Sequence, residues 1–246
     1  MSTKILHVLL DLYILSLIIG LMVKLILFDI DGTLISSGGA GTRALNESFN
    51  EIFSIPDGFQ GVRMAGKTDI EIMKEGMLKH NIKPEDGFGK KMVEGYIYHL
   101  RREINNNGRH LKPGIKEILS RLKEIEGVYL SLLTGNLEKG ARIKLEPFGI
   151  NPYFPFGAFG SDDEDRNRLL PIALRRFSDI YKINLKPEDS IVIGDTPRDV
   201  TCSKPFGAFS VVVATGPYSL EELQNSGADL VLKDLLDQKK LLDSVS

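Results

Sequence analysis

Two aspartates separated by one residue are the strongest chemical signal in the sequence. Asp29 and Asp31 lie in the segment Asp-Ile-Asp-Gly-Thr, at the end of the apolar run 25–29. Side chains alternate along a strand, so both carboxylates are expected on one side of the chain where the strand ends. One carboxylate could then attack phosphorus as a nucleophile, while the other protonates the leaving alkoxide and deprotonates the hydrolytic water. Two acids in a polar turn are the alternative interpretation of this segment alone.

A hydroxyl and two backbone amides follow a second apolar run. Thr134, Gly135 and Asn136 come directly after the run 128–133. The Thr134 hydroxyl and the Gly135–Asn136 amides are suited to hold a phosphoryl oxygen. Taken alone, the same tripeptide is more typical of an ordinary structural turn.

Two more acids follow a third apolar run, 190–193. Asp195 and Asp199 bracket Pro197, which favours the first turn of a helix. They could simply cap that helix and interact with its dipole. Alternatively, Asp195 joins Asp29 around a hard cation, which prefers oxygen ligands. Acids at two strand ends of one sheet repel each other unless a cation such as Mg²⁺ lies between them, and Asp199 could fill both roles.

The elements that must position these residues alternate along the chain. Short apolar runs rich in Val, Ile and Leu, typical of strands buried on both faces, occur at 25–29, 128–133, 190–193 and 209–213. Helical spacing occurs at 115–125, 137–148 and 169–181. This alternation predicts an α/β fold with a doubly wound, Rossmann-like parallel sheet. Ligands of such sheets bind at the carboxyl ends of the strands, where the acids are expected.

The stretch 36–110 interrupts this alternation. It lacks strong strand runs and is typical of helices at 42–53, 69–80 and about 85–106. We therefore predict an α-helical cap domain at 36–110, inserted into an α/β core formed by 23–35 and 111–246.

The first 22 residues form an apolar extension. Residues 5–23 are almost entirely apolar and long enough to span a bilayer, but Asp11 lies inside them. A signal peptide is disfavoured because no small-x-small cleavage site precedes the first strand. A membrane anchor remains an alternative. We favour translation from Met22, because a spanning helix would run into the first strand without a linker.

The composition is that of an ordinary globular protein. The chain has 246 residues, 42% hydrophobic and 26% charged, with a formal net charge of −2. Without clustered Lys and Arg, no nucleic-acid partner is expected. The single cysteine, Cys202, can form neither an internal disulfide nor a metal-binding pair, so a reducing cytoplasm is expected. Its neighbours offer no base, which argues against a nucleophilic role.

Taken together, the motifs resemble those of the haloacid dehalogenase-like hydrolases, of the phosphoglycolate-phosphatase type with a helical cap. The resemblance covers about Leu25 to the C-terminus. It implies that Asp29 is the nucleophile, Asp31 the acid and base, and Thr134 a phosphoryl ligand, with Gly135 and Asn136 beside it. It further implies a Mg²⁺ cofactor held by Asp29, the backbone carbonyl of Asp31, and Asp195, with Asp199 supporting.

The sequence departs from the family at its third motif, where most members carry a lysine. A cation is needed there to offset the nucleophile and the phosphate. Arg166, just before the helix 169–181, is our choice. Arg168 is the second candidate, with a surface position favoured. Lys144 is a third candidate, although it lies in the middle of the predicted helix 137–148.

In the predicted cap, the segment 65–69 resembles the family's substrate-specificity loop. Lys67 could contact phosphate or a substrate carboxylate, whereas Thr68 or Asp69 could simply cap the following helix. Arg43 and Arg63 are weaker candidates. The four histidines, His7, His80, His99 and His110, show no metal spacing and receive no role.

The resemblance therefore implies a Mg²⁺-dependent phosphatase acting through an aspartyl-phosphate on a small phosphorylated metabolite, of which phosphoglycolate is the family's best-known example. A sugar-phosphate mutase shares both aspartates and is the alternative within the family. A dehalogenase or phosphonatase does not need Asp31, which argues against both. A non-catalytic, membrane-associated module is the alternative outside enzymes. The sequence identifies neither the substrate nor the oligomeric state.

Overall fold

A six-stranded parallel sheet forms the centre of the computed structural model, which describes residues 23–84 and 88–245. The strands lie in the order β5-β4-β1-β6-β7-β8, and every neighbouring pair is parallel. Their bounds are β1 (Lys24–Phe28), β4 (Val128–Thr134), β5 (Gly157–Phe159), β6 (Ser190–Gly194), β7 (Phe209–Val213) and β8 (Leu230–Leu232). The predicted doubly wound α/β sheet is confirmed.

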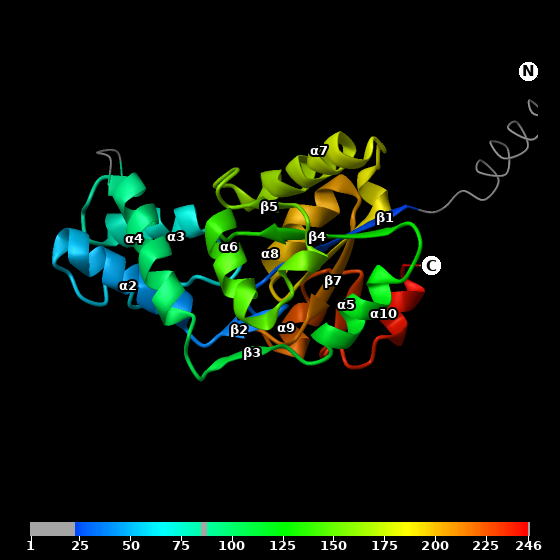
Figure 1. Ribbon diagram of the computed structural model, residues 1–246, viewed down its shortest axis with the longest axis horizontal. Helices are drawn as coiled ribbons and strands as arrows, with labels where there is room; N and C mark the ends of the chain where they lie inside the picture. The colour runs from blue at the N-terminus through cyan, green and yellow to red at the C-terminus, as the bar shows by residue number, and fades with distance from the viewer. Residues whose placement is uncertain (1–22, 85–87, 246) are drawn as a thin grey trace, which may run out of the picture.

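Helices cover both faces of this sheet (Figure 1). Helices α5 (Ile115–Lys123), α6 (Glu138–Leu145) and α10 (Lys239–Asp243) pack on one face, and α7 (Leu169–Tyr181) and α8 (Pro197–Ser203) pack on the other. The short helix α9 (Leu220–Gln224) packs beside β7 and β8.

Alternation along β1 explains why its sequence is apolar throughout. Ile26 and Phe28 join the core on the α5 face, whereas Leu25 and Leu27 join the core on the α7 face, and all four are fully buried. Burying each such side chain stabilises the fold by about 1.5–3 kcal/mol. Strand β1 is therefore held firmly from both sides, and the loop that follows it starts from a rigid point.

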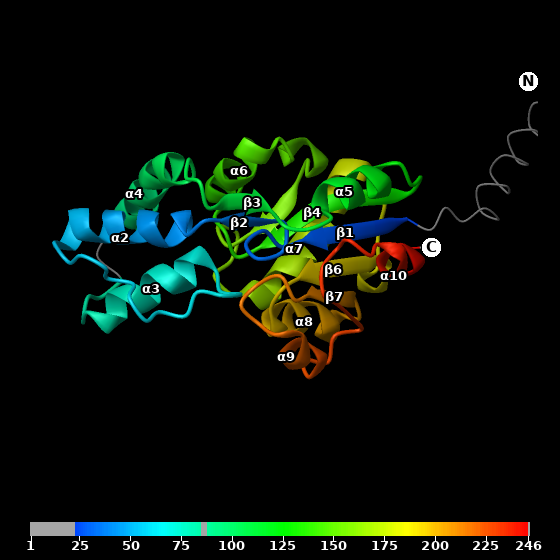
Figure 2. The same cartoon turned by 90° about the horizontal axis from the view of Figure 1, so that it is seen from below.

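Three helices gather at one end of the molecule, beyond the sheet (Figures 1 and 2). They are α2 (Ala40–Phe53), α3 (Asp69–Lys79) and α4 (Phe88–Glu103). Their apolar side chains form a second core that includes Phe49, Met77 and Leu100. This core also contains Leu137, just before α6, and Ile143 within α6. The chain enters and leaves this part through an antiparallel pair, β2 (Ile35–Ser37) and β3 (Arg109–Leu111).

Four short strands, β2, β3, β5 and β8, were not expected from the sequence. Each has only three residues, too few to show a period. The division into a cap at 36–110 and a core at 23–35 and 111–246 stays a prediction, and its boundaries fall within β2 and β3. The first 22 residues, with the predicted extension, lie outside the described residues. Within the described ranges, no helix combines the length and hydropathy of a membrane span.

Candidate active site

The loops after three neighbouring strands bring the predicted acids together. Strand β1 lies between β4 and β6 in the sheet, and all three run in the same direction. Asp29 follows β1, Thr134 ends β4, and Asp195 follows β6. All three side chains are buried, with 5% or less of the residue exposed. This convergence is the one that the motif positions predicted.

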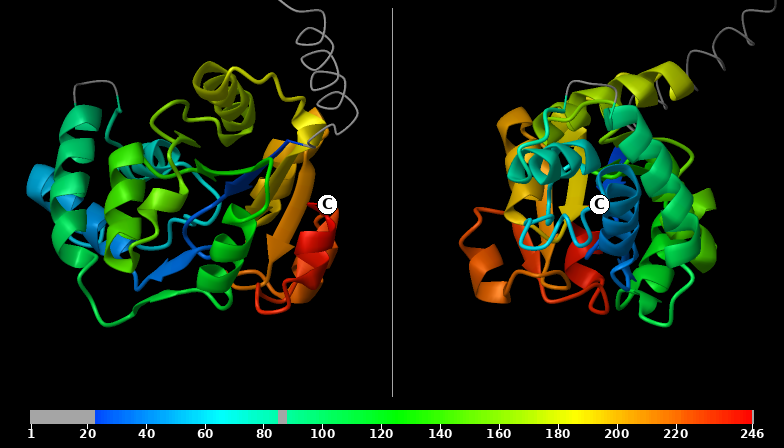
Figure 3. Two further views of the ribbon diagram at one scale, coloured as in Figure 1. Left: turned by 45° about the vertical axis from the view of Figure 1, so that its right-hand side comes forward. Right: turned by 90° about the vertical axis from the view of Figure 1, so that its left-hand side faces the viewer.

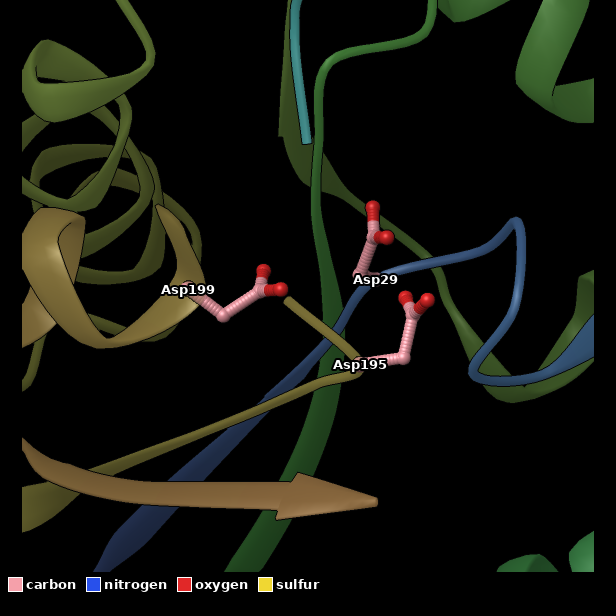
Figure 4. A group of neighbouring side chains, drawn as sticks. All are labelled: Asp29, Asp195 and Asp199. Atoms are coloured by element: carbon pink, nitrogen blue, oxygen red, sulfur yellow. The ribbon is translucent and has the colours of Figure 1, made fainter. Parts of the chain in front are cut away.

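Three buried carboxylates form a possible metal site (Figure 4). One oxygen each from Asp29, Asp195 and Asp199 lies within 4.8 Å of the other two. An octahedral Mg²⁺ holds oxygens at about 2.0–2.1 Å, so its ligands lie roughly 3–4 Å apart. Small side-chain adjustments would therefore suffice, and the all-oxygen donor set fits this ion. Asp31 does not belong to this group through its carboxylate, so its predicted metal contact rests on its backbone carbonyl.

The mutual repulsion of these acids shows in their pKa values. Burial raises the pKa of Asp29 to about 6. The Arg166 guanidinium opposes this rise, and the charges of Asp199 and Asp31 reinforce it. Burial, together with the charges of Asp29 and Asp199, raises the pKa of Asp195 well above its ordinary value. Negative charge therefore exceeds positive charge around these three acids, and a divalent cation would offset the excess.

Glycines permit the close approach of Asp195 to the backbone. A Cβ at Gly32 would lie 2.2 Å from Asp195 Oδ2, and a Cβ at Gly216 would lie 1.6 Å from the same oxygen. Gly32 also has φ +89°, a conformation that L side chains rarely adopt. The glycine after Asp31 is thus required by both sterics and backbone conformation.

Arg166 is the cation beside the nucleophile candidate. Its Nη2 lies 3.2 Å from Asp29 Oδ1 and 2.5 Å from Asp199 Oδ1, and its side chain is 4% exposed. Although burial lowers its pKa, Asp199 and Asp29 raise it well above the ordinary value, so the guanidinium stays charged. Arg168 is instead largely exposed and pairs with Asp163, consistent with the favoured surface position.

Lys144 also enters the site, which corrects the interpretation of its position. The helix predicted for 137–148 ends as α6 at Leu145, followed by a 3₁₀ turn, so Lys144 lies in the last turn rather than in mid-helix. Its Nζ donates to Asp31 Oδ2 at 2.6 Å and to Asn136 Oδ1. Although burial raises the pKa of Asp31, the Lys144 ammonium and the hydrogen bonds from Lys144 and Asn136 lower it below the ordinary value. Each of the two strand-end acids thus has its own cation.

The tripeptide after β4 is already hydrogen-bonded within the site. Asn136 Nδ2 donates to Asp31 Oδ2 and to Thr134 Oγ1, both at 2.9 Å, and the Asn136 amide donates to Thr134 Oγ1 at 3.3 Å. The carbonyl of Gly135 accepts from the Asp69 amide at 2.8 Å. Asn136 therefore orients Asp31 and Thr134, a role that the sequence did not suggest.

The loop that precedes α3 is docked on the α/β part of the chain. Thr68 caps α3 by accepting from the Glu71 amide, and its hydroxyl donates to the Glu164 carbonyl at 2.8 Å. A Cβ at Gly135 would lie 2.1 Å from the Lys67 carbonyl, so only glycine permits this contact. Lys67 itself forms an ion pair with Glu75 of α3.

Asp69 and Tyr96 are site residues that sequence reasoning did not identify. Asp69 Oδ2 accepts from the Leu137 amide at 2.8 Å, so this acid joins α3 to the start of α6 rather than capping its own helix. Tyr96 of α4 is 1% exposed and interacts with Asp69 and Lys144. Tyr96 lies among the apolar residues of α4, so its position gave no chemical signal.

Asp69 should make the stability of the protein depend on pH. Burial raises its pKa to about 6 from an ordinary 3.8, although the Lys144 ammonium opposes the shift. The folded state therefore keeps this proton after the unfolded chain has lost it. The associated stability is present below about pH 4 and is lost as pH rises through about 6, on the order of 3 kcal/mol in total.

We expect Asp69→Asn to remove this dependence. Urea unfolding of the wild type and the variant at about pH 4 and pH 7 measures this dependence. The contributions of the other titrating groups cancel when the free energies of unfolding of the two proteins are subtracted. The free energy of unfolding of the wild type, relative to that of the variant, should decrease from about pH 4 to pH 7. Parallel pH profiles would contradict the assignment.

A cavity of about 260 Å³ lies between the strand ends and the three helices. Asp29, Asp31, Asp195 and Arg166 line its floor, and Lys67, Leu45, Ile72 and Tyr96 line the opposite side. Figure 3 shows the three helices beyond the ends of the sheet strands from two further directions. The predicted nucleophile, acid and base, cation and loop lysine thus line one cavity.

The remaining candidates lie elsewhere. Arg43 pairs with Glu103, and Arg63 is exposed. The described histidines, His80, His99 and His110, line no part of the cavity, and His7 falls outside the described ranges. Burial raises the pKa of the Cys202 thiol to about 12, which agrees with its expected lack of nucleophilic character.

Comparison with known proteins places this fold and site in a class. The family model described as haloacid dehalogenase-like hydrolase matches residues 26–213, which is more than half of the chain. The chain therefore belongs to the haloacid dehalogenase-like hydrolase family, and the predicted resemblance is confirmed.

Individual relatives are distant. A phosphoglycolate phosphatase from Vibrio vulnificus strain YJ016 is 26% identical, with 91% of this chain and 96% of that protein covered. Phosphoglycolate phosphatase 1 from Pseudomonas aeruginosa is 25% identical over 87% of this chain and 78% of its own length. A crystal structure named a predicted phosphoglycolate phosphatase, from Haemophilus somnus 129PT, matches with a TM-score of 0.68 and 20% identity, covering 90% of this chain and 98% of that one. At that identity the last comparison establishes the fold alone.

Proposed function

We propose that this chain is a Mg²⁺-dependent phosphatase that hydrolyses a small phosphate monoester through an aspartyl-phosphate on Asp29. The observation that carries the proposal is the placement of Asp29 on the cavity floor, with Arg166 at 3.2 Å and two further acids within reach of a shared cation. The phosphatase relatives, at 25–26% identity, support the same class of reaction.

The first step transfers the phosphoryl group to Asp29. An oxygen of Asp29 forms the new bond to phosphorus as the bond from phosphorus to the ester oxygen breaks. The negative charge of the bound phosphate would raise the pKa of Asp31, so that this residue takes up a proton on substrate binding and gives it to the departing alkoxide. Arg166 keeps Asp29 in place and offsets its charge. Thr134 and the Gly135 amide are proposed to hold the phosphoryl oxygens.

The second step releases phosphate. Asp31, now ionised, takes a proton from water, and the oxygen of that water attacks phosphorus while the bond to Asp29 breaks. Lys144 and Asn136 hold the Asp31 carboxylate in its ionised form for this step. Asp29, Asp195 and the Asp31 carbonyl would hold Mg²⁺, with Asp199 supporting. When bound, this ion neutralises the charge of the acids and of the phosphoryl group.

Asp31→Asn tests the proposed role of Asp31 as acid and base. It separates protonation of the leaving group in the first step from deprotonation of water in the second. With p-nitrophenyl phosphate, whose leaving group needs no protonation, we expect a normal burst of p-nitrophenol followed by slow turnover. With an alkyl phosphate, the burst itself should be slowed by about 10²–10⁴-fold, the usual contribution of a general acid. Rapid-quench measurements distinguish the two patterns, and equal losses in the burst with both substrates would contradict the role.

The same assays separate hydrolysis from the mutase alternative. A phosphatase releases inorganic phosphate from each ester that it accepts. Conversion of a sugar phosphate into its isomer, without release of phosphate, would favour a mutase instead.

A further inference from the structure

The side of the cavity opposite Asp29, Asp31 and Asp195 carries an apolar patch. Leu45 of α2, Met64 of the docked loop and Ile72 of α3 line it, and Leu45 and Ile72 are almost fully buried. Lys67 is the cation on this side, and its side chain is 14% exposed. The part of the substrate that lies beyond the phosphoryl group would meet these residues.

Every cation of the cavity is already paired with a carboxylate. Among the cavity-lining residues in the described part of the chain, the cations are Lys67, Lys144 and Arg166. Arg166 contacts Asp29 and Asp199, and Lys144 contacts Asp31. Lys67 reaches Glu75, an α3 residue that does not line the cavity. Neither the floor of the cavity nor its opposite side therefore offers an unpaired cation, among the described residues, to a substrate group beyond the phosphoryl position.

A second anionic group on the substrate would consequently lie in an unfavourable place. Asp69 also lines the cavity and would repel it. A carboxylate removed from water needs a partner of opposite charge to compensate for its lost hydration. Lys67 could be that partner only if its ion pair with Glu75 were broken.

We propose that Glu75 determines the substrate class by neutralising Lys67, so that the enzyme favours phosphate monoesters of uncharged alcohols with an apolar face. The alcohol would pack against Leu45, Met64 and Ile72. This inference rests on the proposed phosphatase function. It also separates the substrate of this chain from the one named for its distant phosphoglycolate phosphatase relatives.

A matched pair of substrates tests the proposal on the purified full-length protein with Mg²⁺. The compounds 2-phosphoglycolate and 2-hydroxyethyl phosphate have the same chain, ending in a carboxylate and in a hydroxymethyl group, and propyl phosphate adds an apolar end. We expect kcat/KM for both neutral esters to exceed that for 2-phosphoglycolate by at least about tenfold, as for a polar group left unpaired in a site. Equal values, or a preference for 2-phosphoglycolate, would overturn the proposal.

Glu75→Gln tests the role of the ion pair itself. The amide keeps the size of the side chain but frees Lys67, so the ratio of kcat/KM for 2-phosphoglycolate to that for 2-hydroxyethyl phosphate should rise at least about tenfold, mainly through KM. Adding Lys67→Met to this variant should return the ratio to the wild-type value. An unchanged ratio in Glu75→Gln would overturn the assignment of Glu75.

Glu71→Gln is the matched control. Glu71 lies on the same helix and also forms an ion pair, but with Arg198 and away from the cavity. The Glu71→Gln variant should keep the wild-type activity and the wild-type ratio of kcat/KM for the two esters. A change in this ratio equal to that of Glu75→Gln would overturn the proposal. If the wild type released no phosphate from any ester, including p-nitrophenyl phosphate, the proposed function would fail as well. Hydrolysis with a preference for the anionic ester would overturn only the present inference.

Discussion

Asp29→Asn is expected to lower kcat for any phosphate monoester by at least about 10⁴-fold, because the loss of a covalent nucleophile has effects of this size or larger. The amide has nearly the same shape as the carboxylate but cannot form the aspartyl-phosphate. Phosphate release under saturating Mg²⁺ measures the effect.

The fold should survive this substitution. Burial already raises the pKa of Asp29 to about 6, so the carboxylate is ionised at neutral pH but its ionisation lowers the stability of the folded protein. Arg166 retains Asp199 at 2.5 Å as its partner. We therefore expect the free energy of unfolding at neutral pH to be equal to that of the wild type or higher.

Asp179→Asn, at an exposed position, serves as the control for Asp29→Asn and should keep full activity. Wild-type phosphatase activity in Asp29→Asn would show that this residue is not the nucleophile. Loss of both activity and fold would show that Asp29 has a structural role instead.

Removal of Mg²⁺ is expected to have the second-largest effect, reducing activity to background in EDTA and restoring it on addition of the ion. The three acids of the cluster are each 5% exposed or less, and Arg166 is the one cation that pairs with them among the described residues. Binding should also stabilise the fold, by about 2.7 kcal/mol at a hundredfold excess over Kd.

Asp195→Asn tests whether the loss of activity in EDTA and the stabilisation by Mg²⁺ both come from this metal site. The pKa of Asp195 is raised by burial and by its acidic neighbours, so the neutral amide should increase the stability of the metal-free protein while abolishing activity. The Tm of the wild type should rise with added Mg²⁺, and that of the variant should not. An equal rise in both proteins would place the ion elsewhere.

The larger features of the fold could be predicted because they depend on patterns several residues long. Strands β1, β4, β6 and β7 are continuous apolar runs, and α7 has the predicted bounds 169–181. The three-residue strands could not be found in this way, because their pairing depends on neighbours distant in the sequence. Strand β5, for example, is defined by its register with β4.

The site was predictable where chemistry follows a strand end, and less so elsewhere. Asp29, Thr134 and Asp195 meet because their strands are neighbours. Which cation pairs with which acid depends on tertiary packing. Arg166 reaches the site from a 3₁₀ turn, and Lys144 reaches it from the end of α6. Asp69 and Tyr96 come from the inserted helices, and only packing brings them to Lys144.

Identification of the phosphorylated residue tests the central claim most directly. Asp31→Asn, which should accumulate the intermediate, is mixed with p-nitrophenyl phosphate and Mg²⁺, quenched in acid, reduced with borohydride and digested with trypsin. In the tryptic peptide 25–43 of this variant, Asp29 is the remaining aspartate. We predict that it is recovered as homoserine, the product of a reduced aspartyl-phosphate. An unmodified peptide, despite a measured burst of p-nitrophenol, would contradict the account.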